Sequence, residues 1–472
     1  MFYLNQKFDN LINLTREKTT DFVYSYFFPT LVALISLLFW IADLQLIGLT
    51  IVTLTTCFVF VVYDDFLPII PLMLMIPMCF RDPSTAISST IVPIIVIFSL
   101  LVLAIIFHLI KYSITIKFDK YSFMLICIVG LFIFSGIFAI NFNNYLKAFD
   151  LFIISAIAPL AIHLFFYSKV KLNEKINYRR YFCFSFICAI TLASMQLCYV
   201  FTYIKLIGPW PLGEMPGGFT WSNSNHVANL VLIAVPLCCY MMASTKRIWA
   251  WFIELLFLYL TLLLSSSDGG LATLVIFTPF IMYFLYQNAY ISNRKFLRYA
   301  YFIIISIAIL IVAILCLFLF DELLEFILSS SSSNGRNFLY SAALECFKER
   351  PIFGVGFGNG KACVENIIEV PDARGFFHST FFHVLACAGM VGIIVYLIYY
   401  IVRIKYLIKG DSLLGKFSLI SLLMFAIYAL IENSEFNIVL MFMTTIITFV
   451  GLTNKKGSVD TPLPLYVKNP KF

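Results

Sequence analysis

Charged side chains are scarce in this chain of 472 residues. Asp, Glu, Lys and Arg make up 12%, about half of what soluble domains carry. Hydrophobic residues make up 61%, more apolar surface than a soluble core could hide, in successive runs near the roughly 20 residues that cross a bilayer. The runs lack the polar alternation of barrel strands, so they are expected to be helices. The sequence therefore predicts an all-α, polytopic integral membrane protein.

Metal-binding cysteine patterns are also missing. The 12 cysteines are scattered singly, without a CxxC pair or a Cys/His spacing suited to zinc, so no metal and no cofactor is expected. Cys346 and Cys363 share one predicted outer loop; a disulfide is one interpretation, and two isolated side chains is the favoured one. The net charge of +7 lies in short loops between apolar runs, where it orients helices. It does not indicate a nucleic-acid partner.

The apolar runs predict about 12–14 transmembrane helices and a large extracytoplasmic loop that carries amphipathic helices. Lys and Arg gather in alternate loops, which places those loops and both termini in the cytoplasm. The third span is short and rich in proline, so it is expected to be kinked or partly re-entrant. The fourteen expected spans lie near residues 26–44, 46–63, 66–80, 91–110, 122–140, 149–167, 182–204, 226–243, 249–266, 270–289, 299–320, 379–402, 415–432 and 436–453.

Two predicted outer segments, 205–225 and 321–378, are longer than connectors need to be. Long ordered loops are uncommon unless they are functional, so the chemistry is expected there. The chain divides into N-terminal transmembrane helices in 1–204, a central region in 205–402 that holds both outer loops, and C-terminal transmembrane helices with a cytoplasmic tail in 403–472.

The larger loop begins with a helix signal. Ser and Asn precede an apolar periodic run, and Pro351 stops it, which predicts an amphipathic helix over 336–350. Arg336 lies in the first turn, where free N–H groups already favour an anion, so it is a candidate phosphate ligand. A solvated surface arginine is the plain alternative. The glycine-rich stretch 354–360 could form an anion-binding nest, but a tight packed turn is at least as well supported.

The loop ends with Arg374 and His378, four residues apart and therefore on one face of any helix. Arg374 is a second candidate phosphate ligand. His378 is expected at the mouth of the twelfth span, where a histidine beside phosphate-binding arginines is a reasonable general base for a hydroxyl. His383 lies on another face and is interpreted as a core histidine.

These segments together resemble the O-antigen ligase and polysaccharide polymerase superfamily. The resemblance rests on GRNFLYSAALECFKERPIFGVGFGNG at 335–360 and on HSTFFHVLACAGMVG at 378–392, whose His-Ser pair is followed by two spaced glycines. FTWSNSNHVANLVLIAVP at 219–236 is similar to the family's Asn-Pro-Asn segment, with Ser224 in place of Pro, and suggests Asn223 and Asn225 as further binding residues. The likeness covers 219–402 well and the first 200 residues only in hydropathy.

One position departs from the family pattern. Members commonly carry an Arg after the ninth span, in a Ser-Arg-Gly context, whereas this chain reads SSSDGGLA and has Asp268 there. Asp268 cannot bind phosphate, so another cation must compensate or the donor is held differently. Arg374 is the first candidate, with Lys205 and Lys361 weaker ones.

The resemblance implies a metal-independent, inverting glycosyltransferase in the bacterial inner membrane. It would transfer a glycan from an undecaprenyl-diphosphate-linked donor to a glycan or glycolipid acceptor on the outer face, as a surface-polysaccharide polymerase. An O-antigen ligase that moves the finished chain to lipid A core is the close alternative. Membrane lipid, flippases and chain-length regulators are the other expected partners. A transporter of lipid-linked sugars ranks lower, because it would need ionisable residues at mid-membrane.

Overall fold

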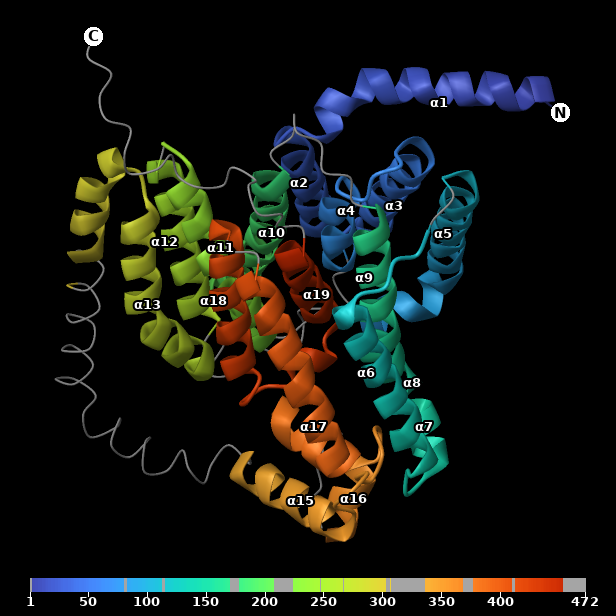
Figure 1. Cartoon of the computed structure of the whole chain (residues 1–472), viewed down its shortest axis with the longest axis vertical. Coiled ribbons are helices and arrows are strands. Elements are labelled where there is room, and N and C mark those ends of the chain that lie inside the picture. The colour runs from blue at the N-terminus through green and yellow to red at the C-terminus, as the bar shows by residue number, and fades with distance from the viewer. Residues whose placement is uncertain are drawn as a thin grey trace.

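The computed structural model is a bundle of helices (Figure 1). The structure describes most of the chain, in the ranges given at the end of this paragraph. Within those ranges no strand is present, so the all-α architecture is confirmed. Arg374, Asn223 and most of the eleventh expected span lie outside these ranges. The structure describes residues 2–79, 83–112, 115–169, 178–207, 224–246, 248–265, 267–302, 306, 336–367, 377–409 and 412–452.

The polytopic membrane character is confirmed. Eight described helices are long and apolar enough to cross a membrane, or nine if α1 and α2, bent by 81°, count as one span. Three further apolar helices, in α12, α18 and α19, are shorter. The third expected span consists of the short α4 and η1. The long helices are α2 (Phe27–Ile41), α3 (Gln45–Val62), α5 (Pro83–Lys111), α6 (Lys120–Ile137), α9 (Ala158–Lys169), α10 (Tyr178–Ile207), α11 (Ser224–Ser244), α12 (Ile248–Leu264), α13 (Asp268–Asn288), α17 (Thr380–Lys409), α18 (Leu413–Tyr428) and α19 (Ile438–Leu452).

The remaining elements connect or flank these helices. Residues 291–302 are also helical. The helix expected over 336–350 is confirmed as α15, whereas α1 and α16 were not predicted. The shorter or flanking elements are α1 (Phe2–Val23), α4 (Ile69–Met75), η1 (Pro77–Cys79), α7 (Phe142–Lys147), α8 (Phe149–Phe152), the π-helical turn η2 (Ile153–Ile157), α15 (Arg336–Glu349), α16 (Gly360–Ile367) and η3 (Ser434–Phe436).

Helix α11 forms the centre of the bundle and α5 its edge. The span of α11 is 94% buried, packed among α10, α12, α13 and α18, whereas that of α5 is 17% buried. A helix that is apolar all round belongs inside, and the exposed apolar side chains of α5 are those that lipid would cover.

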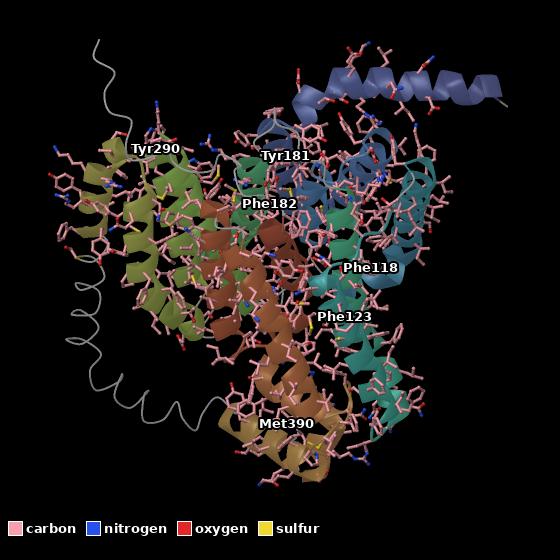
Figure 2. All side chains as sticks on the ribbon, viewed as in Figure 1. Phe118, Phe123, Tyr181, Phe182, Tyr290 and Met390 are labelled. Atoms are coloured by element: carbon pink, nitrogen blue, oxygen red, sulfur yellow. A yellow bond between two sulfur atoms is a disulfide. The ribbon has the colours of Figure 1, made fainter. Side chains whose placement is uncertain are left out.

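The bundle has two distinct ends. Helix α1 lies across one end, and α7, α15 and α16 lie at the other (Figure 1). Figure 2 places Tyr181 and Tyr290 toward the α1 end and Met390 beside α15. Since the terminal helix α1 and the 336–367 segment lie at opposite ends, they fit opposite sides of a membrane, as the expected topology requires.

Helix α17 is broken at Gly389, although its residues form one apolar run. Gly389 has φ +63° and ψ −157°, a backbone conformation that side chains rarely allow. A Cβ on Gly392 would lie 3.4 Å from the carbonyl O of Val384, eight residues earlier. In a straight helix that spacing would be about 12 Å along the axis. The span expected over 379–402 is present within α17, but its two halves meet at a sharp bend at Gly389 and fold back on each other.

The 351–356 turn satisfies both of the broken helix ends. The N–H groups of Met390 and Val391 donate to the carbonyls of Pro351 and Ile352 at 2.8 and 3.2 Å. In the other direction, Val355 and Gly356 donate to the carbonyls of 386 and 387, both at 2.9 Å. These are the backbone groups that a helix end leaves without partners. A Cβ on Gly354 would overlap the backbone of 386–388, so glycine is required for this approach.

The tight-turn interpretation of the glycine-rich stretch is confirmed. Five of its seven N–H groups already donate to protein acceptors, so these five have no hydrogen left for a phosphate. The donors are the N–H groups of Gly354, Val355, Gly356, Phe357 and Asn359, which bond respectively to the oxygens of Arg350, Ala386, Cys387, Ser135 and Gly356.

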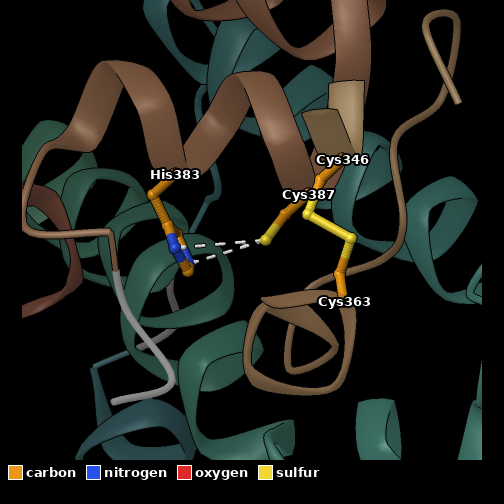
Figure 3. Close-up of a disulfide and its surroundings, with 4 residues drawn as sticks. All are labelled: Cys346, Cys363, His383 and Cys387. Atoms are coloured by element: carbon orange, nitrogen blue, oxygen red, sulfur yellow. Dashed lines mark hydrogen bonds between the residues drawn. A yellow bond between two sulfur atoms is a disulfide. The ribbon is translucent and has the colours of Figure 1, made fainter. Parts of the chain in front are cut away.

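A disulfide joins α15 to α16. Cys346 and Cys363 are bonded (Figure 3), so the favoured interpretation of two isolated side chains is wrong. The bridge lies beside Cys387 and His383 of α17 (Figure 3). His383 is fully buried, against the ring of Phe436 at 4.7 Å, as expected for a core histidine.

Arg403 falls one residue beyond the twelfth span, which was expected over 379–402, but it is helical and not part of a loop. It lies in the second half of α17, is fully buried, and its Nη1 is 3.3 Å from Oε1 of Glu435, which is also fully buried. Thr448 accepts from its Nε at 3.0 Å, and Tyr400 donates to the same carboxylate. A buried pair of this kind costs desolvation on both sides, so its surrounding hydrogen bonds are needed to hold it.

The substitution Gly389→Ala tests the turn. The alanine would have to take positive φ, which costs about 1–2 kcal/mol, and its Cβ would lie 2.5 Å from the carbonyl O of Ile352. We expect a clearly lower midpoint of thermal aggregation in detergent. Gly130→Ala is the matched control, since no heavy atom lies within 4 Å of a Cβ there. Equal midpoints for the two variants would contradict the packing.

A second substitution tests the disulfide. Its cysteines are 17 residues apart, a loop for which cross-linking contributes about 3 kcal/mol. Replacing both cysteines by alanine should lower the aggregation midpoint, whereas Cys127→Ala, which removes a free thiol from α6, should not. When the denatured protein is labelled with maleimide, reduction should increase the number of labelled thiols by two. Identical labelling with and without reductant would show that the bridge is absent.

Candidate functional site

His378 lies two residues before α17 and has a left-handed backbone. Its φ is +49°, uncommon for a residue other than glycine. The hydroxyl of Ser379 accepts from the N–H of Phe382 at 3.4 Å, which caps the helix. The side chain of His378 is 25% exposed, but its Nδ1 is buried. Strained residues of this kind cluster at functional sites.

Glu432 lies beside His378 and joins three elements. It follows α18, in the short connection to α19, and its side chain is 5% exposed. One carboxylate oxygen, Oε1, is 3.5 Å from Nδ1 of His378. The other, Oε2, accepts from Nδ2 of Asn225 at the start of α11 at 3.1 Å. The carbonyl of Glu432 accepts from both the N–H and the hydroxyl of Thr380, so the carboxylate is held firmly.

A second histidine completes the group. His226 interacts electrostatically with both Glu432 and His378, and its Nδ1 is 3.1 Å from Nδ2 of Asn437. We call Asn225, His226, His378, Glu432 and Asn437 the Glu432 cluster. Asn225, a predicted binding residue, is thus brought together with His378.

The cluster keeps its carboxylate charged. Burial raises the pKa of Glu432, but the hydrogen-bonding and charge interactions with His378 and His226 outweigh it, so the pKa lies below its ordinary value. An ionised carboxylate beside one ring nitrogen orients the imidazole and stabilises its protonated form, while the other nitrogen can accept a proton. This arrangement suits a general base.

The other predicted residues divide into two groups. Asp268 is exposed at the start of α13. The next residue, Gly269, packs so closely against Ile431 that a Cβ would overlap it, which places the Asp268 turn beside the connection that carries Glu432. Arg336, where α15 begins, and Lys205, in α10, are described in backbone only.

Helix α15 nevertheless contacts the His378 segment. The hydroxyl of Tyr340 donates to the carbonyl of His378 at 3.4 Å. Tyr340 follows Arg336 by four residues, so the two share a face of the helix. The first turn of α15 is therefore directed to the neighbourhood of the Glu432 cluster. Within the described part of the chain, no three His, Cys, Asp or Glu residues are arranged to hold a metal ion.

Sequence reasoning missed Glu432 and His226. The stretch ENSEFN at 432–437 interrupts two apolar runs with five polar residues, and that signal was available. The expected thirteenth span ran to residue 432 and so absorbed it, whereas α18 ends at Tyr428. His226 was part of the quoted family-like segment, but its role could not be read there.

Comparison with known proteins supports one family. A model of the family described as O-antigen ligase matches residues 253–397, which is less than half of the chain. The matched part runs from α12 into α17 and contains His378, α15 and α16. No curated protein matches the chain. The resemblance to the O-antigen ligase-like superfamily is confirmed for this region, and it indicates a glycosyltransferase function of the ligase or polymerase kind.

Proposed function

We propose that this protein is a surface-polysaccharide polymerase. It transfers a glycan from an undecaprenyl-diphosphate-linked donor to a sugar hydroxyl at the end of the bundle that carries α15 and α16. The observation that carries the proposal is the contact of His378 with a buried, charged Glu432, next to the helix that begins at Arg336. The O-antigen ligase match over 253–397 supports the reaction class.

In the proposed reaction His378 is the general base. Nδ1 faces Glu432, so Nε2 takes the proton from the acceptor hydroxyl. The acceptor oxygen then forms a bond to the anomeric carbon as the bond from that carbon to the diphosphate oxygen breaks, with inversion. The electron pair stays on the leaving diphosphate. Glu432 stabilises the imidazolium, and the proton is later released to water.

The leaving diphosphate requires positive charge. Arg336 and Arg374 are the proposed ligands, because a guanidinium binds phosphate oxygens in a bidentate manner and stabilises charge that develops there. The contact of Tyr340 with the His378 carbonyl fixes the helix on which Arg336 lies. Two arginines would supply this stabilisation without a metal ion.

The site is proposed to face the extracytoplasmic side of a bacterial inner membrane, with both termini in the cytoplasm. The disulfide between α15 and α16 favours this orientation, because such bonds persist in oxidising compartments. A diphosphate-linked lipid also demands a site at a membrane mouth, with its tail in lipid and its sugars outside.

The ligase alternative shares this chemistry and differs in the acceptor. Asp268, where family members commonly have Arg, is the feature that favours a polymerase slightly. The transporter hypothesis gains the deep ion pair Arg403–Glu435, but both side chains are fully buried and paired with each other. They do not line a path through the bundle, so this pair does not favour transport.

The substitution His378→Ala tests the base. In a strain that lacks the chromosomal copy, it should lower polymer on a glycan gel by 10²-fold or more, since a positioned base contributes about 10²–10⁴-fold. Expression of the variant is verified by immunoblot. Normal polymer length and amount with His378→Ala would exclude the base role.

Glu432→Gln tests the carboxylate separately. The amide keeps the shape and a partner for Asn225 but loses the charge, and comparable losses in Ser-His-Asp enzymes reach about 10⁴-fold. We expect at least a tenfold lower rate with purified enzyme, and the acid limb of its pH profile at lower pH. Glu345→Gln, on the exposed face of α15 beside Lys348, is the control. A rate loss with an unmoved pH profile would indicate only a structural role.

A further inference from the structure

A cavity of about 360 Å³ lies within the membrane-spanning part of the bundle, in the size range of small-ligand sites. Helices α3 and α5 form one wall, α9 the other, with α4, η1 and α19 between them. Apart from Thr56, all its lining residues are Phe, Met, Leu, Ile, Val, Ala or Pro. The Thr56 hydroxyl is bonded to the carbonyl of Val52 at 2.8 Å. The cavity therefore provides apolar contacts to its occupant and no hydrogen-bond partner.

The occupant must come from the lipid phase. Helix α5 lies at the edge of the bundle (Figure 1) and contributes Phe98, Leu101 and Ile105 to the cavity. Phe98 is 37% exposed, and its neighbours Ile95 and Val102 are more exposed still. The cavity wall is thus continuous with the surface that lipid chains cover.

The cavity also adjoins the Glu432 cluster. Val439 lines it, and its N–H donates to Oδ1 of Asn437, the residue that contacts His226. On the opposite side Ile154 lines it, and the adjacent Ser155 donates to the carbonyl of Glu435 at 3.2 Å. Both polar contacts come from residues within two positions of the cavity wall. A molecule held beside the cluster by its polar end could place its apolar end here.

The π-helical turn η2 (Ile153–Ile157) shapes this side of the cavity. Such turns are rare and occur often at functional sites. On the wall formed by η2 and α9, the lining residues Ile154 and Phe166 are 12 residues apart, a distance of about 18 Å along a helix. The cavity therefore spans the first isoprene units below a diphosphate, and not the whole of a long tail.

We propose that this cavity binds the isoprenoid units nearest the diphosphate of the lipid-linked donor. The proposal rests on the proposed function, because the diphosphate, held by Arg336 and Arg374 beside the cluster, is what selects a prenyl chain over the acyl chains of bulk lipid. A branched, unsaturated hydrocarbon suits a wall built from Phe rings and branched aliphatic side chains. The chain enters from the side of α5, and its sugar head stays at the α15 end of the bundle.

The test uses full-length protein in lipid nanodiscs. A polyprenyl diphosphate with a diazirine near its head group is photolysed, and labelled peptides are mapped by mass spectrometry. We expect labels in 154–166 and 439–442, displaced by unlabelled undecaprenyl diphosphate but not by phospholipid. Ala158→Trp, which fills the cavity, should lower the labelling at least tenfold. Ala250→Trp, on the exposed face of α12, should leave it unchanged.

Each alternative outcome is decisive. Equal labelling by a diazirine phosphatidylethanolamine, not displaced by prenyl diphosphate, would mean a general lipid site and overturn the proposal. Absent labelling of these peptides in a protein that transfers glycan would overturn it and leave the proposed function intact. Specific labelling in a protein that transfers no glycan would support prenyl binding and contradict the transferase.

Discussion

The site depends on the backbone contact between the 351–356 turn and the break of α17 at Gly389. A helix that stops and reverses leaves amide and carbonyl groups without partners, which is costly where water is scarce. The carbonyls of the turn accept from the N–H groups that begin the second half of α17. Its own N–H groups donate to the carbonyls that end the first half. Only because α17 folds back here can its first residue, Thr380, dock on Glu432 while its later part reaches Glu435. The glycines therefore serve geometry more than ligand binding.

The short connection between α18 and α19 is clamped from two directions. Glu432 is held by Asn225 and Thr380, and Glu435, three residues later, by Arg403 and Tyr400. Replacing a buried ion pair by apolar residues is often neutral or stabilising, so stability alone does not explain Arg403. Its position suggests a different benefit. By fixing η3, the pair limits the places that the neighbouring carboxylate can take, and with it the ring of His378.

The sequence could predict the helices, but not the break of α17 or the contact between His378 and Glu432. The apolar runs located the long helices because hydropathy is a local property, and the caps around 336–350 located α15 for the same reason. Gly389 stood out in the sequence only as one of the two spaced glycines of the family-like segment, and its backbone conformation was not predicted, since its positive φ is imposed by contacts with Ile352 and Gly354. Glu432 was lost for a similar reason. Its partner His378 is distant in sequence, and nothing local to either residue indicates their contact.

The region matched by the family model contains only part of the site, and the division follows from what a general base requires. Residues 253–397 contain the proposed base and the helix that begins at Arg336. The groups that charge and orient that base, Glu432 and Asn225, lie outside the matched region. A general base needs both a proton-accepting nitrogen and an environment that stabilises the acquired charge. In this chain α11 and the α18–α19 connection supply that environment, so in the proposed mechanism the transmembrane helices around the matched region would take part in the chemistry as well as in anchoring it.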